Sequence, residues 1–323
     1  MVLWDTIQAF ILAHPLGFHL SVIGVCLILL AQASSLTVMG ISNYAKKLGL
    51  SDYLIGLLVV ALAASVPEFL ASLSGVALES PDVVFGTIFG SNIIGITLIL
   101  GAFAIIGKNV PVDEKVFEKT KWDIVILTSL PFVLMFDGLL GKIDGVVLLI
   151  SFAAYAIVLW RREGESGKMK KNVKFKSLYK DAALFISNLI IVLICSFFLV
   201  NSSLNIASIL SLSPFLVAIV ILGIGSQVPD LFLGLQAMKK GHDGVAVGDL
   251  IGSMITKSLL FLGIFGFSSL AFDRANVIFL GILTVGTLVL LFNFIQKGSL
   301  TRENGFYLIG IYAIFMLIQV LFF

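Results

Sequence analysis

Long apolar runs alternate with short polar connectors along the whole chain. A helix that crosses a lipid bilayer needs about 20 largely apolar residues, so the pattern predicts ten membrane spans and an all-α membrane protein. The connectors fall where Gly, Pro, Asn and charged residues cluster, as at Lys108–Pro111. The predicted spans are Gly17–Ser42, Tyr53–Leu78, Val83–Ile106, Trp122–Phe136, Gly145–Trp160, Ala182–Val200, Pro214–Met238, Gly244–Phe267, Asn276–Ile295 and Tyr307–Phe323.

Composition agrees with this pattern and excludes a soluble protein. Only 12% of the residues are charged and 59% are hydrophobic, whereas soluble domains carry about 25% charged residues. The net charge of +2 gives no indication of nucleic-acid binding, because the basic residues lie in short connectors. Cys26 and Cys195 lie in apolar runs without metal-ligand spacing, so they are predicted to be buried packing residues rather than a disulfide or a zinc site.

The distribution of Lys and Arg predicts the orientation in the membrane. The connectors after spans one, three, five, seven and nine hold 18 of the 21 basic residues, and the opposite side holds only Lys142 and Arg274. The remaining one, Lys257, lies inside span eight. Because basic connectors face the cytoplasm, both termini are predicted to lie outside an inner or plasma membrane, with the central loop in the cytoplasm.

Two stretches of the chain are copies of one design. Ala61–Glu68 is followed by Gly86–Asn92, and Gly223–Asp230 is followed by Gly248–Met254, with matching positions 162 residues apart. The copies begin in spans two and seven, which are five spans apart and therefore cross the membrane in opposite directions. This is an inverted-topology repeat, which is typical of secondary transporters.

The repeat and the loops predict four regions. Met1–His14 lacks a positively charged start and carries Asp5, so it is predicted to lie at the membrane interface rather than to be a cleaved signal peptide. The predicted regions are an interfacial N-terminal segment (1–16), a first five-helix repeat (17–160), a basic cytoplasmic loop (161–181) and a second five-helix repeat (182–323).

Each copy places an acid directly after Val-Pro inside an apolar run: Glu68 after Pro67, and Asp230 after Pro229. A proline within a helix removes a backbone donor and frees carbonyl groups, and a simple kink would explain the prolines alone. The acids are harder to explain by packing, because a charge at the centre of a span costs at least about 2.5 kcal/mol. Two such costs at matching positions predict that Glu68 and Asp230 bind a cation directly.

Other oxygen-bearing residues accompany the acids. Carboxylate, carbonyl and hydroxyl oxygens are the hard ligands that cations such as Ca²⁺ prefer, and the glycines of each copy allow close helix packing that would bring Ser91 beside Glu68. The residues predicted to help bind the cation are Ser65, Ser91, Ser226, Gln227 and Ser253.

The duplicated [Ser/Thr]-x-Pro-Glu element, followed by Gly-x-x-x-Gly-Ser-Asn, resembles the sodium/calcium exchanger superfamily of cation/calcium antiporters. The resemblance covers nearly the whole chain and implies that spans two, three, seven and eight surround a cation site. It places Glu68 and Asp230 where the family has its two central acids, usually both Glu. It matches Ser65 and Gln227, Ala64 and Ser226, and Ser91 and Ser253 to family hydroxyl positions.

The departures from the family pattern lie four residues after the matched serines. Family members usually carry Asn or Asp there in one or both repeats, whereas this chain has Gly95 and Lys257, and Ala64 also lacks the usual hydroxyl. Glu68 and Asp230 together carry −2, and an ionised Lys257 reduces this to −1. Such a site is poorly matched to Ca²⁺ plus several Na⁺.

Three accounts of Lys257 are compatible with the sequence. It can act as a fixed cation that replaces one transported ion. It can lose its proton when a divalent ion binds, which would couple cation transport to H⁺, although a neighbouring carboxylate opposes this. It can also snorkel to the membrane surface or form a salt bridge with Asp230.

Three polar residues are predicted to lie around the site rather than in it. Asp249 is predicted to be a helix-start acid near the cytoplasmic interface, and its counterpart Thr87 indicates no strict need for charge there. Asn92 is predicted to make a polar contact between spans, since its counterpart Met254 cannot bind a hard cation.

These observations predict a secondary antiporter that exchanges Ca²⁺ or another cation for Na⁺ or H⁺ by alternating access. Its expected partners are the lipid bilayer and inorganic cations, with no cofactor and no nucleic acid. The alternative is a non-transporting relative in which Lys257 has closed the site. An enzyme is not expected, because the spans hold no nucleophile-His pair and no Gly-x-Gly-Asp element.

Overall fold

The computed structural model of the chain describes residues 15–48, 60–77, 79–111, 114–165, 223–295 and 298–322, together with isolated residues between 183 and 219. Nearly all of the predicted interfacial segment lies outside the described residues. So do residues 166–181 of the basic loop, the first part of span two and about half of span six.

Helices dominate the described chain, and four very short strands lie at their ends. The first repeat contains α2 (Pro15–Leu48), α4 (Ala61–Ala64), α5 (Val66–Ala77), α6 (Pro81–Ile94), η2 (Gly95–Ile99), α7 (Leu100–Gly107), β1 (Asn109–Pro111), α8 (Glu114–Leu134), η3 (Met135–Asp137), β2 (Leu139–Leu140) and α9 (Lys142–Glu165). The second contains α12 (Gly223–Lys239), α13 (Asp243–Ile255), η5 (Thr256–Phe261), α14 (Leu262–Phe265), η6 (Gly266–Ser268), β3 (Leu270–Ala271), α15 (Arg274–Ile295), β4 (Ser299–Thr301) and α16 (Arg302–Phe322).

Among the described residues, five helical segments are long and apolar enough to cross a membrane, and they coincide with the third, fifth, eighth, ninth and tenth predicted spans. They are Pro81–Gly107, Lys142–Arg161, Asp243–Ser268, Arg274–Ile295 and Arg302–Leu321. The first predicted span lies within α2, and the fourth overlaps α8, which begins earlier than predicted, at Glu114. The second, sixth and seventh predicted spans are only partly described, so the count of ten remains a prediction.

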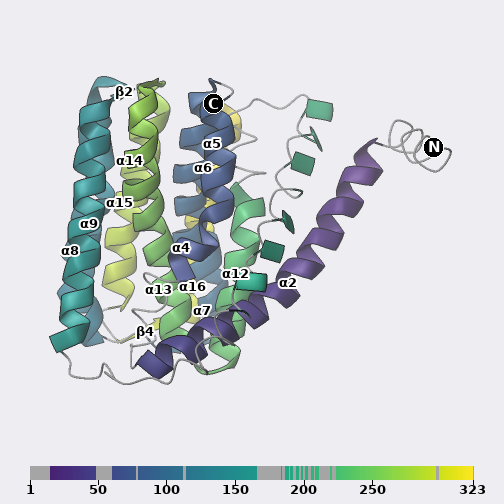
Figure 1. Cartoon of the computed structure of the whole chain (residues 1–323), viewed down its shortest axis with the longest axis vertical. Helices are drawn as coiled ribbons and strands as arrows, with labels where there is room; N and C mark the ends of the chain where they lie inside the picture. Colours follow the sequence, from purple (N-terminus) through teal and green to yellow (C-terminus); the bar gives the residue numbers. More distant parts are fainter. Residues whose placement is uncertain are drawn as a thin grey trace.

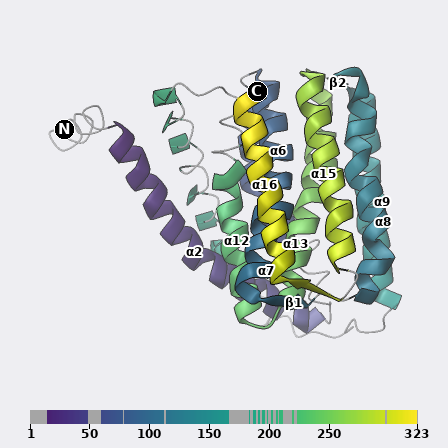
Figure 2. The same ribbon diagram turned by 180° about the vertical axis from the view of Figure 1, so that it is seen from behind.

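The segments differ in how deeply they are buried. About 83% of the apolar window is buried in Pro81–Gly107 and in Asp243–Ser268, against 22% in α9 and α16. Figures 1 and 2 show the same order in space: α5, α6, α12 and α13 lie in the middle of the bundle, with α8, α9 and α15 on one side. On the other side, α2 crosses obliquely and packs against α12. The repeated motifs therefore occupy the centre of the molecule.

The turns of the two repeats have matching backbone conformations. Six described residues have positive φ, a conformation that is uncommon outside glycine, and they form three pairs whose members lie 160 to 162 residues apart. The pairs are Glu79 and Gly241, Lys108 and Ser269, and Gly138 and Gly298. Equivalent turns thus adopt equivalent conformations in the two repeats, although their residue types differ.

Two short antiparallel ladders tie the repeats together. β1 pairs with β4, and β2 pairs with β3, so each ladder takes one strand from each repeat. Adding the offset of 162 residues to the position of β1 gives approximately the position of β3, and adding it to β2 gives approximately that of β4. The two ladders are therefore equivalent under the repeat. The β2 end of the bundle lies opposite the β1 and β4 end (Figures 1 and 2), as inverted halves require.

Close helix contacts through glycine are also duplicated. A Cβ on Gly305 of α16 would meet the Gly101 carbonyl of α7 at 2.7 Å. A Cβ on Gly145 of α9 would meet the Gly263 carbonyl of α14 at 2.6 Å. Small residues let helix backbones approach in membranes, and the outer helix of each repeat is thus anchored to a central helix of the other repeat.

The two cysteines are buried and free, as predicted. Cys26 of α2 and Cys195 form a small apolar cluster with Ala33, against which Val22 and Ile23 pack. This cluster is separate from the main core around the central helices.

Candidate cation site

Glu68 lies just after an interruption in its span. α4 ends at Ala64, Ser65 forms a turn, and α5 begins at Val66, so Pro67 occupies the first turn of a new helix, where a missing backbone donor costs little. This places Glu68 in the same first turn, completely buried. The disruption that Pro67 is expected to cause in the turn before it is present at Ser65.

The second copy differs from this prediction. α12 runs without interruption from Gly223 to Lys239 and passes through Pro229, so the two motifs do not break their helices in the same way. Proline removes only one hydrogen bond from a helix whose other turns remain intact. Asp230 consequently projects from the middle of a continuous helix, and it is also fully buried.

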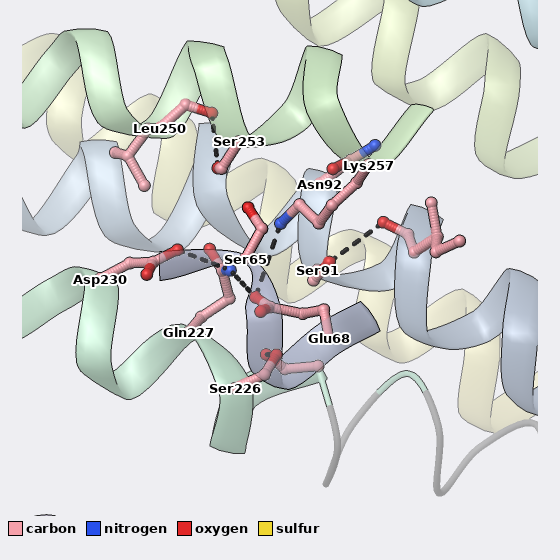
Figure 3. Close-up of polar contacts among 12 residues, drawn as sticks. Ser65, Glu68, Ser91, Asn92, Ser226, Gln227, Asp230, Leu250, Ser253 and Lys257 are labelled. Carbon is pink, nitrogen blue, oxygen red and sulfur yellow. Dashed lines mark hydrogen bonds and ion pairs between the residues drawn. The ribbon is translucent and has the colours of Figure 1, made fainter. Parts of the chain in front are cut away.

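A glutamine joins the two acids. The Gln227 side-chain nitrogen donates to Glu68 Oε1 and to Asp230 Oδ2, at 3.0 Å each (Figure 3). Glu68 comes from the first repeat, whereas Gln227 and Asp230 come from the second. The two predicted acids therefore share one donor at the junction of the repeats. Glu68 Oε2 and Asp230 Oδ1 have no hydrogen-bond partner in the described chain.

Lys257 points toward the same carboxylate. Its ammonium nitrogen lies 3.7 Å from Glu68 Oε1, and its side chain is 1% exposed. The snorkelling account is therefore wrong, because Lys257 remains within the bundle. Lys257 forms its salt bridge with Glu68, whereas one of the three accounts paired it with Asp230, since Lys257 lies on η5, which contacts α5.

Both departures from the family pattern lie in π-helical turns. Gly95 opens η2, and Lys257 is the second residue of η5. Such wide turns inside α-helices are frequent at functional sites. A Cβ on Gly95 would lie 3.0 Å from Gln227 Oε1, so the glycine leaves the space that the Gln227 amide occupies. A larger side chain at position 95 would thus compete for space with the glutamine at position 227.

The four predicted serines are buried and orient their oxygens alike. Each hydroxyl donates to a carbonyl of its own segment, and this leaves the oxygen free to act as a ligand. The bonds run from Ser65 to Ala61 (2.7 Å), Ser91 to Ile88 (3.0 Å), Ser226 to Gly223 (3.2 Å) and Ser253 to Leu250 (3.1 Å).

The residues predicted to lie around the site show different outcomes. Asn92 makes the predicted contact between spans: its Nδ2 donates to Ser258 Oγ at 2.9 Å. Thr87 is buried, and its hydroxyl has no hydrogen-bond partner among the described residues. Asp249 does not start its helix, because α13 begins at Asp243. It lies inside the helix and is 1% exposed, so the helix-start prediction is wrong.

The charge of the site is consequently larger than the sequence indicated. Asp249 adds a third buried carboxylate to Glu68 and Asp230, and three carboxylates against the Lys257 ammonium give a formal charge of −2. Within the described residues, no group of three acidic, His or Cys side chains is arranged to hold one metal ion. A bound cation would therefore take at most two carboxylates, with hydroxyl, amide and carbonyl oxygens completing its shell.

Two inverted repeats of apolar helices around buried carboxylates define a membrane transporter of the secondary type. The family model described as "Sodium/calcium exchanger protein" matches residues 18–161 and 180–321. The chain belongs to this family.

Relatives agree with this assignment over most of the chain. The uncharacterized membrane protein MJ0091 of Methanocaldococcus jannaschii is 29% identical over 89% of this chain and 93% of its own length. The sodium/calcium exchanger MaX1 of Methanosarcina acetivorans is 24% identical over 90% and 95%, respectively. The putative antiporter CaxA of Alkalimonas amylolytica is 28% identical over 74% and 77%.

The fold matches solved structures of the sodium-calcium exchanger NCX_Mj. One of them, soaked with Na⁺ and Sr²⁺, superposes with a TM-score of 0.79 and is 28% identical, covering 93% of this chain and 98% of that one. The all-helical, inverted-repeat architecture predicted from the sequence is confirmed.

Proposed function

We propose that this protein is a secondary antiporter that exchanges Ca²⁺ or another hard cation for Na⁺ or H⁺ by alternating access. The observation that carries the proposal is the pair of fully buried acids, Glu68 and Asp230, which come from opposite repeats and share the Gln227 side-chain nitrogen. Buried charge at the junction of inverted repeats is the arrangement by which such transporters bind ions.

The proposed ligands are the free oxygens around this pair. Glu68 Oε2 and Asp230 Oδ1 have no partner within the described chain, and the buried serine hydroxyls use only their hydrogen atoms. Buried polar oxygens are normally satisfied, so this group of oxygens fits a cation better than a closed structural network. The names of two relatives, an exchanger and a putative antiporter, support the same function.

Lys257 fits the role of a fixed positive charge that replaces one bound ion. It lies 3.7 Å from Glu68 and is buried with it. The alternative, in which Lys257 closes the site and abolishes transport, is not favoured, because Asp230 has no ion pair within 4 Å in the described chain and keeps one oxygen free.

The proposed setting is an inner or plasma membrane, with both termini outside and the connector after α9 in the cytoplasm. The distribution of basic residues supports this orientation. In that setting, the loop that holds Lys239 and Lys240 between α12 and α13 also faces the cytoplasm.

Transport into proteoliposomes tests the proposal. We expect wild-type protein to take up ⁴⁵Ca²⁺ in exchange for Na⁺ or H⁺ that leaves the vesicles down an outward gradient. We expect Glu68→Gln to lose most of that uptake, because Lys257 would then be an unpaired buried cation. Glu303→Gln removes an exposed carboxylate from α16 and is the matched control. Uptake by Glu68→Gln equal to that of wild type would show that the site is assigned wrongly.

Lys257→Asp tests the fixed-charge role. Replacing the ammonium with a carboxylate changes the charge of the site by two, so we expect transport to continue with more positive charge carried per cycle. The measurement is the reversal potential of uptake in vesicles with imposed membrane potentials. An unchanged reversal potential would contradict this role for Lys257.

A further inference from the structure

Asp249 is a third buried acid, in addition to the two central acids Glu68 and Asp230. It lies in α13 rather than at its start, is 1% exposed, and neither carboxylate oxygen has a hydrogen-bond partner in the described chain. A buried carboxylate without a partner is costly. A purely structural acid would be expected to make hydrogen bonds in its surroundings, and Asp249 makes none with the described residues.

Its position on the helix directs Asp249 toward the site. Asp249, Ser253 and Lys257 are spaced by four residues, so they follow one face of α13 and its continuation into η5. α13 packs against α12, which carries Gln227 and Asp230. Asp249 therefore lies on a helix that packs directly against the helix of Asp230, on the same face as Lys257.

The partners of Lys257 and Gln227 leave the negative charge unevenly distributed. Glu68 Oε1 receives both the Lys257 ammonium and one Gln227 bond, whereas Asp230 receives only the other Gln227 bond. Within the described residues, Glu68 is the one carboxylate within 4 Å of Lys257. Asp230 and Asp249 are therefore the two buried acids of this cluster without a cation within 4 Å in the described residues, and in their ionised forms they would neutralise one divalent cation.

We propose that Asp249 is a further ligand of the transported cation, which it shares with Asp230, and that this pair makes the site selective for a divalent ion. The inference rests on the proposed antiport function and names its substrate class. Two carboxylates supplemented by Ser253 and carbonyl oxygens form a set that hard divalent cations accept. Lys257 and Glu68 then form an ion pair beside the site, and this pair carries no net charge.

The other repeat provides a matched comparison. Thr87 occupies the position that corresponds to Asp249, and its buried hydroxyl also has no partner in the described chain. An oxygen thus projects from this position in both halves, but only the second half places a charge there. Asp249→Thr copies the first repeat into the second with a side chain that the fold already accepts at the corresponding place.

Equilibrium binding of ⁴⁵Ca²⁺ to the purified full-length protein tests the inference. Because divalent affinity follows the number of charged ligands, we expect Asp249→Asn and Asp249→Thr to raise the Kd for Ca²⁺ by more than about tenfold. Asp243→Asn removes an acid from the start of the same helix and should leave the Kd within about twofold. Ca²⁺ binding by both Asp249 variants within about twofold of wild type would overturn the inference.

Asp249→Glu separates a ligand from a residue that merely shapes the site. A longer carboxylate keeps the charge and changes the size of the site, so we expect binding to persist with an altered ratio of the Kd values for Ca²⁺ and the larger Sr²⁺. An unchanged ratio would count against direct contact. If wild-type protein neither binds nor exchanges any cation, the proposed function itself fails. If Asp230→Asn abolishes binding while both Asp249 variants bind normally, only the role of Asp249 fails.

Discussion

The two repeats share one backbone design and differ in their chemistry. Both contain a π-helical turn and the same set of positive-φ turns, and the outer helix of each packs through a glycine against a central helix of the other repeat. At matching positions, however, the first repeat has Glu68, Gly95 and Thr87, whereas the second has Asp230, Lys257 and Asp249. The scaffold is symmetric, and the charges are not.

This difference separates two requirements of a transporter. Alternating access needs halves that can exchange conformations, which a repeated backbone provides. Ion selectivity depends on the number and placement of charged ligands, and most of the charged residues of this cluster come from the second repeat. Its donors, Gln227 Nε2 and Lys257 Nζ, both act on the single acid of the first repeat. The first repeat thus contributes one acid, and the second contributes most of the groups that set its charge.

The largest expected effect comes from removing the central acid of the charged half. We expect Asp230→Asn to lower cation exchange in proteoliposomes by more than about 100-fold, because loss of one buried charge from a polar cluster costs about 2–5 kcal/mol. Asp82→Asn, at the exposed start of α6, should retain full exchange. If Asp230→Asn kept half of the wild-type rate, the second repeat would not supply the cation site.

The shared scaffold predicts equal losses in the two halves. Gly145→Ala and Gly305→Ala each drive a methyl group into a backbone carbonyl, at 2.6 and 2.7 Å, so we expect each to lower the free energy of unfolding by about 1–3 kcal/mol. Gly310→Ala, with open space around its Cβ, is the control. Thermal unfolding in detergent measures the effect. A loss confined to one variant would break the symmetry of the scaffold.

A smaller effect is expected where the halves meet. The new methyl group of Gly95→Ala would lie 3.0 Å from Gln227 Oε1 and must displace the amide that joins the acids. We expect Ca²⁺ affinity to fall by about tenfold, or about 1.4 kcal/mol, with little change in stability. Gly286→Ala, which meets nothing within 4 Å, should bind as wild type. Equal binding by both variants would mean that the Gln227 bridge does not set the affinity.

The smallest expected effect concerns one hydrogen bond between the halves. Asn92→Ala removes the 2.9 Å bond to Ser258, so we expect stability to fall by about 1 kcal/mol while Ca²⁺ binding stays within about twofold of wild type. Thermal unfolding and ⁴⁵Ca²⁺ binding on the same preparation measure both quantities. A large loss of binding would place Asn92 among the ligands rather than between the helices.

Much of the architecture could be predicted because it depends on local patterns. Apolar runs identify the spans, and the 162-residue offset between the motifs identifies the repeat and its inversion. Each acid after Val-Pro could be recognised as a candidate functional residue, because buried charge is too costly to occur twice by accident. The uninterrupted helix through Pro229 could not be predicted, because a proline is compatible both with a break and with a continuous helix.

The site itself was only partly predictable. Spacing by four residues from Asp249 to Ser253 and Lys257 could have indicated a shared helix face. The predicted span begins at Gly244, one residue from the start of α13 at Asp243, so the boundary was right and only the position of Asp249 within the helix was misjudged. The bond from Asn92 and the space that Gly95 leaves for Gln227 connect residues more than 130 positions apart. No sequence period relates residues at such distances.

The sequence by itself determined that this chain is a duplicated, inverted bundle of apolar helices with an acid at the centre of each half. Hydrophobic periodicity and the cost of buried charge act within single segments, so they can be recognised along the chain. Only the tertiary structure decided that Lys257 pairs with Glu68, that Gln227 joins both acids and that Asp249 belongs to the same cluster. Those contacts depend on how four helices pack, and helix packing is fixed by side chains that are distant in sequence.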